Sequence, residues 1–151
     1  MTSTFTYTNA VPQYGAFNSG QWAQHEKLVR NYAITVCSKQ SGDLYLLTGI
    51  SDMVIRSSGK NLNSVKPAGT PKRIPMKPPK IVIPNSMWTA GCCVNGNKVI
   101  GNFAMIGNNV SNKVKILMSQ VTVEDLEILA DITDLFPGNS DCYNSKYDVS
   151  L

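Results

Sequence analysis

A chain of 151 residues is long enough for one domain with one hydrophobic core. Its apolar fraction of 42% and charged fraction of 16% exclude an intrinsically disordered chain. No apolar run approaches the roughly 18 residues that a membrane-spanning helix needs. The first nine residues lack the basic and apolar regions of a signal peptide. We therefore expect one globular domain with no membrane contact, either cytosolic or with its true start upstream.

The net charge of +4 is unevenly distributed. The span from Met53 to Val123 contains no Asp or Glu, yet it holds ten of the fourteen Lys and Arg residues. A long basic span without acidic residues suits a polyanionic partner such as nucleic acid. An ordinary solvated surface is the competing interpretation, and charge alone favours it.

The N-terminal third is expected to form an extended segment and then a long helix. Residues 4–10 alternate aromatic and polar side chains, which indicates a short strand or an extended segment. A helix should start at Asn18 or Ser19, because Asn18 and Gln21 resemble a capping box, and should run to about Val36. Apolar residues at helical spacing predict its buried side: Trp22, Val29, Ala33 and Val36.

Two strands should follow, at residues 44–50 and 53–57, because both segments are apolar and rich in β-formers. Residues 57–80 then change in character, since they hold five prolines and six basic residues. We expect an exposed, partly polyproline-like loop there, within the domain and not between domains.

The next segments predict a strand pair or one interrupted strand at residues 81–84 and 87–94. Asn95-Gly96 is the expected hairpin tip, and residues 99–107 are the expected return strand. Because strands and helices mix without strict alternation, the expected fold class is α+β.

A second helix is predicted at residues 121–132. Thr122 should cap it, and Glu124 and Asp125 favour its N-terminus. Three residues should form its buried stripe: Leu126, Leu129 and Ala130. Phe136-Pro137-Gly138 should end it, which gives a domain over residues 1–138 and a polar tail over 139–151 that frays unless Cys142 holds it.

The four cysteines are Cys37, Cys92, Cys93 and Cys142, and their spacing matches no zinc site. Adjacent cysteines on a strand point to opposite faces, so Cys92 and Cys93 need different partners. Two disulfides would use all four cysteines and fit an oxidising compartment. Four buried thiols in a cytosolic protein are an equally good interpretation of the spacing.

Three polar residues of the first helix have the chemistry of a metal-dependent phosphodiesterase. The Asn18 amide oxygen could bind a hard divalent ion that keeps several waters. Glu26 lies eight residues later, about 80° round the helix, and Arg30 is at i+4 from Glu26. Taken alone, Asn18 is more simply a helix cap, and Glu26 with Arg30 a surface pair that stabilises by roughly 0.3–0.5 kcal/mol.

The surrounding segment resembles the DNA/RNA non-specific endonucleases. The resemblance rests on residues at fixed spacing: Thr4-Phe5, Asn9, Pro12-Gln13, Asn18, Gly20-Gln21-Trp22, Glu26 and Arg30. It implies that Asn18 is a ligand of Mg²⁺ or Mn²⁺, that Glu26 is the acid of the metal helix with Arg30 beside it, and that Asn9 is a supporting polar residue. The chain would be the C-terminal portion of a ββα-metal domain.

Residues 44–49 and 83–93 extend the resemblance, most closely to the vertebrate extracellular branch of the family. This implies secretion and makes disulfides the better use of the cysteines. We expect Cys37 and Cys142 to be the partners of Cys92 and Cys93, in an order that the sequence leaves open.

The family's catalytic base is a histidine in a DRGH-like motif upstream of the position of Asn9, which this chain starts too late to contain. The lone histidine, His25, lies within the metal helix, and we expect it to pack half-buried and not to act as the base. Cysteine nucleophile chemistry has no His/Asn arrangement to support it. As an isolated chain the protein should therefore be inactive or nearly so.

Three hypotheses follow. The first is a nuclease domain that grips DNA or RNA with basic residues: Lys60, Lys66, Lys72, Arg73, Lys77 and Lys80. The second is a non-catalytic module that binds nucleic acid or another polyanion through the same 57–80 loop. The third is a non-functional fragment, whose sheet would have an exposed edge and would aggregate.

Overall fold

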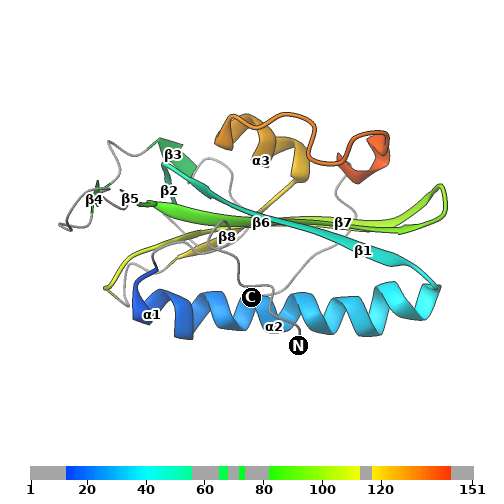
Figure 1. Ribbon diagram of the computed structural model, residues 1–151, viewed down its shortest axis with the longest axis horizontal. Helices are drawn as coiled ribbons and strands as arrows, with labels where there is room; N and C mark the ends of the chain where they lie inside the picture. Colours follow the sequence, from blue (N-terminus) through cyan, green and yellow to red (C-terminus); the bar gives the residue numbers. More distant parts are fainter. Residues whose placement is uncertain (1–12, 56–64, 68–71, 74–81, 113–116, 144–151) are drawn as a thin grey trace.

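Three layers make up the protein in the computed structural model, which describes residues 13–55, 65–67, 72–73, 82–112 and 117–143. A long helical layer covers one face of a four-stranded antiparallel sheet, and a short helix with the C-terminal turn covers the other (Figure 1). The expected α+β class is confirmed. In the described part of the chain, no helix has the length and apolarity to span a membrane.

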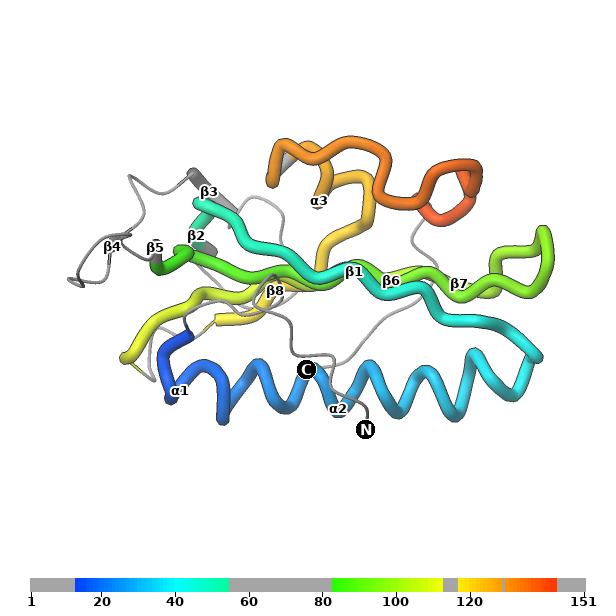
Figure 2. The backbone as a smooth tube through the Cα atoms, viewed as in Figure 1, coloured from blue at the N-terminus to red at the C-terminus, as the bar shows by residue number. Residues whose placement is uncertain are grey.

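The helical layer is one nearly continuous rod, as the tube in Figure 2 shows. It consists of α1 (Gly15–Phe17), a π-helical turn (Asn18–Trp22), α2 (Ala23–Tyr32), a second π-helical turn (Ala33–Cys37) and a 3-10 turn (Ser38–Gln40). The rod ends where Ser41 adopts the left-handed conformation, with a φ of 57°. It therefore runs four residues past the predicted end at Val36.

The predicted cap at Asn18 or Ser19 is wrong. Asn18 has helical φ and ψ of −63° and −46°, and its backbone N–H already donates to the carbonyl of Tyr14. The Ser19 hydroxyl donates backwards to the carbonyl of Gly15, as it does inside a helix. The rod starts at Gly15, and its irregularity lies at Gly20, whose φ and ψ of −100° and −113° are not helical.

The sheet has the order β1-β6-β7-β8. Its strands are β1 (Asp43–Ser51), β6 (Ser86–Asn95), β7 (Lys98–Asn108) and β8 (Met118–Val121). β6 and β7 lie in the centre and are buried on both faces, which explains their continuous apolar runs. Asn95 pairs with Lys98, so the turn consists of Gly96 and Asn97, one residue after the predicted tip, and Gly96 has a φ of 59°.

Two small strand pairs lie beside one end of the sheet (Figure 1). β2 (Met53–Ile55) pairs with β3 (Val65–Pro67), and β4 (Lys72–Arg73) pairs with β5 (Val82–Ile83). The prediction of a loop throughout residues 57–80 is therefore wrong at β3 and β4, where backbone pairing overrides the proline-rich composition. The rest of that segment lies outside the described residues.

The second predicted helix is confirmed as α3 (Val123–Ala130). The Asp125 backbone N–H donates to the Thr122 hydroxyl at 3.0 Å, which is the expected cap. The helix ends earlier than predicted, because Asp131 adopts the left-handed conformation with a φ of 53°. Phe136 is instead a core residue, only 6% exposed, in the segment that leads to a 3-10 turn (Ser140–Tyr143).

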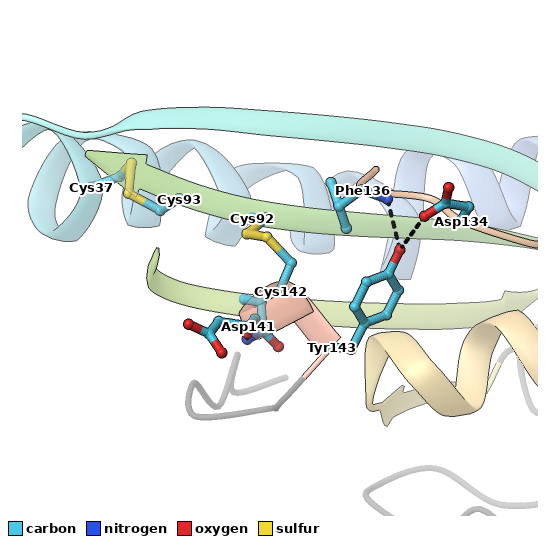
Figure 3. The surroundings of a disulfide bond; sticks show 9 residues. Cys37, Cys92, Cys93, Asp134, Phe136, Asp141, Cys142 and Tyr143 are labelled. Carbon is cyan, nitrogen blue, oxygen red and sulfur yellow. Dashed lines mark hydrogen bonds between the residues drawn. A yellow bond between two sulfur atoms is a disulfide. The ribbon is translucent and has the colours of Figure 1, made fainter. Parts of the chain in front are cut away.

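Two disulfides join the outer layers to the central strand β6 (Figure 3). Cys37 at the end of the helical rod bonds to Cys93, and Cys142 in the C-terminal turn bonds to Cys92. Because adjacent residues of a strand face opposite ways, each bond reaches a different layer. The expected partners are thus confirmed, and the order that the sequence left open is settled. Cys142 ties down the start of the tail.

Candidate functional site

A groove of about 450 Å³ runs between the helical rod and the edge strand β1. It is lined by Trp22, His25, Glu26, Val29, Arg30, Leu46, Thr48 and Thr89. Trp22 and Val29 form an apolar floor, while Glu26 and Arg30 stay exposed. The hydroxyls of Thr48 and Thr89 lie 3.4 Å apart across the β1–β6 pair. The groove therefore has an apolar floor and, beside it, a carboxylate and a guanidinium that water can reach.

Glu26 and Arg30 are one helical turn apart on α2. No ion pair joins them among the residues that the structure describes. A carboxylate and a guanidinium on one rim, each free of the other, can contact a ligand that carries both a cation and an anion, such as a metal–phosphate complex.

His25 is enclosed far more than expected, with only 1% of its surface exposed. Its ring packs on Trp22 with the ring centroids 5.1 Å apart. Desolvation by burial lowers the pKa of His25 to about 4, so the ring is neutral at pH 7. Within the described part of the chain neither ring nitrogen has a hydrogen-bond partner. The imidazole belongs to the wall of the groove.

Asn18 is exposed near the start of the rod, and among the described residues its side-chain amide makes no hydrogen bond. The π-helical turn and the kink at Gly20 lie between Asn18 and Glu26. The separation of about 80° that a regular helix gives between Asn18 and Glu26 therefore does not apply to their side chains. The amide and carboxylate oxygens are the donors that Mg²⁺ prefers.

These two donors would have to share a metal ion with water and substrate. The described residues contain no cluster of three or more His, Cys, Asp and Glu side chains that could hold an ion by themselves. Two oxygen donors do not enclose an ion, so a hard cation bound by them would keep water molecules among its ligands.

Two of the predicted basic residues lie on the short strand β4. Lys72 and Arg73 of β4 pair with Ile83 and Val82 of β5. Ile83 in turn lines a pocket of about 280 Å³ with Tyr14, which directly precedes α1. β5 therefore lies between the basic strand β4 and the residue that precedes the rod. Lys66 lies on β3, whereas the other predicted site residues lie outside the described part: Asn9, Lys60, Lys77 and Lys80.

Asn109 is a positioning residue that the sequence reasoning missed. The backbone N–H of Tyr14 donates to its Oδ1 at 3.0 Å, and its own Nδ2 donates to the carbonyl of Pro84 at 3.1 Å. Its backbone N–H donates to the carbonyl of Asn85. One buried amide thus fixes the start of the rod against the β5–β6 connection. Consecutive asparagines at the end of an apolar strand were the available signal.

Comparison with known proteins identifies the lineage. Neither the curated proteins nor the solved structures include a match to the chain. The family model of the DNA/RNA non-specific endonucleases matches residues 1–140. This range is most of the sequence and includes the rod, the sheet and α3. The chain belongs to the DNA/RNA non-specific endonuclease family.

Proposed function

We propose that this chain carries the metal-binding and nucleic-acid-binding part of a non-specific endonuclease, over residues 1–138 with a tail at 139–151. The substrate is the phosphodiester backbone of DNA or RNA, and the cation is Mg²⁺ or Mn²⁺. The observation that carries the proposal is the exposure of Asn18, Glu26 and Arg30 on one rod, with the last two on the rim of a groove.

The three side chains differ in charge, and their proposed roles differ accordingly. Asn18 Oδ1 is the neutral oxygen donor for the cation, and the Glu26 carboxylate accepts hydrogen bonds from water beside it. The Arg30 guanidinium faces the negative charge that develops on the phosphoryl oxygens. When bound, the divalent cation polarises the phosphate and neutralises part of that charge.

A general base is the part that this set of residues lacks. His25 is the only histidine of the sequence, and it is neutral at pH 7 but enclosed in the groove wall. A base must reach the attacking water, directly or through one water molecule. We propose that His25 is a packing residue and that the 151-residue chain binds nucleic acid but cleaves it poorly or not at all.

The test separates binding from cleavage. A fluorescent oligonucleotide is titrated with the chain, with and without Mn²⁺, and Mn²⁺ should tighten binding. Asn18→Ala and Glu26→Ala should lose the Mn²⁺ effect, whereas Gln24→Ala, an exposed residue of the same helix, should keep it. In a plasmid-nicking assay with Mg²⁺ the wild-type chain should show little cleavage. Robust nicking that His25→Ala abolishes would contradict the proposed role of His25.

An extracellular location is part of the proposal, in keeping with the vertebrate extracellular branch. Its support is that all four cysteines of the sequence form disulfides, which persist in oxidising compartments.

A second candidate is a non-catalytic module that grips a polyanion through the basic 57–80 segment. The position of Lys72 and Arg73 on β4, which pairs with β5 beside the Tyr14 pocket, favours it. The two candidates differ in whether binding depends on the cation.

A further inference from the structure

The pocket of about 280 Å³ at the start of the rod has a polar lining. Its walls come from the residue before α1, from the end of β5 with the connection to β6, and from the segment after β7. The polar residues that line it are Tyr14, Asn85, Asn109, Ser111 and Asn112. The groove beside β1 shares none of these residues, so the two hollows are separate.

The polar groups of this pocket are uncharged. No Lys, Arg, Asp or Glu is among the described residues that line it, so a phosphate would meet no opposite charge inside. An asparagine amide offers two donors and an oxygen with two lone pairs, so it can keep a protein partner and still contact a ligand. The remaining lining is apolar and includes Ile83 and Val110. The matching ligand is uncharged, with apolar faces and a polar edge.

The volume and Tyr14 narrow the class of ligand further. Pockets for drug-sized molecules hold roughly 300–1,000 Å³, so a pocket of about 280 Å³ suits one small ring system. Tyr14 is half-buried: it packs against the core cluster that contains Phe17 and Met105, and it also lines the pocket. Aromatic side chains in such places are stacking surfaces for planar rings. A nucleobase has the size, the apolar faces and the polar edge that this lining fits.

The segments that border the pocket also carry parts of the proposed nucleic-acid site. The backbone N–H of Asn18 donates to the carbonyl of Tyr14 at 2.9 Å, so the proposed cation ligand lies one helical turn from a residue of the pocket wall. Ile83, on the opposite wall, pairs with Lys72 of the basic strand β4. Charged and metal-binding groups for a phosphate thus lie on the same segments as an uncharged pocket for a base.

We propose that this pocket binds one nucleobase of the substrate, with Tyr14 stacked on the base and the asparagine amides at its polar edge. The inference rests on the proposed function and adds a preference for single-stranded over duplex nucleic acid. A base in a duplex must be unpaired and unstacked before it can enter a pocket. Stacking tolerates every base, so the pocket gives this preference without sequence specificity.

A free nucleoside tests the pocket in the absence of cation and phosphate. Cytidine is titrated into the ¹⁵N-labelled chain without metal, with ribose as the control ligand. Cytidine should shift the backbone amide signals of Val110 and Asn112, and ribose should not. Tyr14→Leu keeps the backbone bond to Asn109 and should raise the dissociation constant of cytidine by about fivefold or more, because a stacking surface is lost.

A matched pair of asparagine variants makes this test specific. Asn112→Ala should weaken cytidine binding, whereas Asn97→Ala, at an exposed position in the β6–β7 turn, should leave it unchanged. The proposal is wrong if cytidine shifts no signal of the pocket, or if ribose shifts the same signals equally, since the pocket would then recognise a sugar.

An oligonucleotide separates the pocket from the phosphate contacts. The wild type should bind a short single strand about fivefold or more tightly than the same strand made of abasic sites, and more tightly than the duplex. Tyr14→Leu should remove the first difference and keep the effect of Mn²⁺ on binding. Equal affinity of the wild type for the intact and abasic strands would overturn the proposal. If Mn²⁺ has no effect while cytidine still shifts the pocket signals, the cation site fails and the base pocket stands.

Discussion

The rings of Trp22 and His25 pack against each other with centroids 5.1 Å apart and planes inclined at 50°. Both residues are almost fully buried, at 2% and 1% exposure. The pair therefore presents imidazole to the groove as a neutral, largely dehydrated ring. Burial removes water from the ring and so explains why the pKa of the one histidine of the chain lies below its ordinary value.

The burial of His25 predicts acid sensitivity. Its pKa is about 4 in the folded chain and 6.5 in the unfolded chain. Between these pH values the unfolded chain binds the proton and the folded chain does not, so the free energy of unfolding falls as the pH drops from 6.5 towards 4. The full effect is roughly 3 kcal/mol. His25→Leu should remove it and should also remove two unsatisfied buried nitrogens.

Urea denaturation at pH 7.5 and at pH 4.5 measures this effect. The carboxylates titrate in both proteins, so the difference between His25→Leu and wild type isolates the histidine. The free energy of unfolding of His25→Leu minus that of wild type should be larger at pH 4.5 than at pH 7.5. If the free energy of unfolding falls by the same amount in both proteins between pH 7.5 and pH 4.5, folding does not lower the pKa of His25.

The two disulfides should contribute similar amounts of stability. They join residues 56 and 50 positions apart, and loop closure over such lengths corresponds to about 4 kcal/mol each. Cys37→Ala with Cys93→Ala, and Cys92→Ala with Cys142→Ala, should each lower the free energy of unfolding by about that amount in urea. Thiol titration of the denatured wild type should find no free thiol, and four reactive thiols would refute the pairing.

Gly91 is a position where β6 tolerates no side chain. A Cβ there would overlap the ring of Phe103, its register partner on β7, which is fully buried. Gly91→Ala should therefore destabilise the protein by about 1–3 kcal/mol. Gly15→Ala is the control, because a Cβ at Gly15 meets no atom within 4 Å. Thermal unfolding measures both variants. Equal melting temperatures for Gly91→Ala and Gly15→Ala would show that the Phe103 ring moves aside at little cost.

The sequence predicted those elements whose patterns are local. The apolar, β-prone runs of β1, β6 and β7 and the cap at Thr122 were sufficient, because each depends on neighbouring residues. The start of the rod was missed because Asn18 is a common cap, whereas here the chain is already helical three residues earlier. The strands β3 and β4 were missed because their pairing partners lie outside their own segment.

The candidate site was predictable in its residue types and not in its geometry. Asn18, Glu26 and Arg30 follow from their spacing and their resemblance to the family. The kink at Gly20 changes how they face, and no pattern of hydrophobicity indicates a π-helical turn. The complete burial of His25 depends on strands that follow it by many residues, so the helix alone suggested only partial burial.

Phosphate contacts by the basic strand should be visible in the salt dependence of binding. Each phosphate neutralised by a lysine or arginine contributes about 0.7 to 0.9 to the slope of log affinity against log salt. Lys72→Gln with Arg73→Gln should reduce that slope by between about 1 and 2. Lys39→Gln with Lys98→Gln is the charge-matched control, and it should leave the slope unchanged. An unchanged slope in the Lys72 and Arg73 variant would exclude β4 from the interface.

A Mn²⁺ titration of the ¹⁵N-labelled chain shows whether Asn18 and Glu26 bind the cation. Paramagnetic broadening should first remove the amide signals between Asn18 and Glu26. The broadening should disappear in Asn18→Ala and in Glu26→Ala, and it should persist in Gln24→Ala. Broadening centred elsewhere, or equally strong in wild type and Asn18→Ala, would contradict the account.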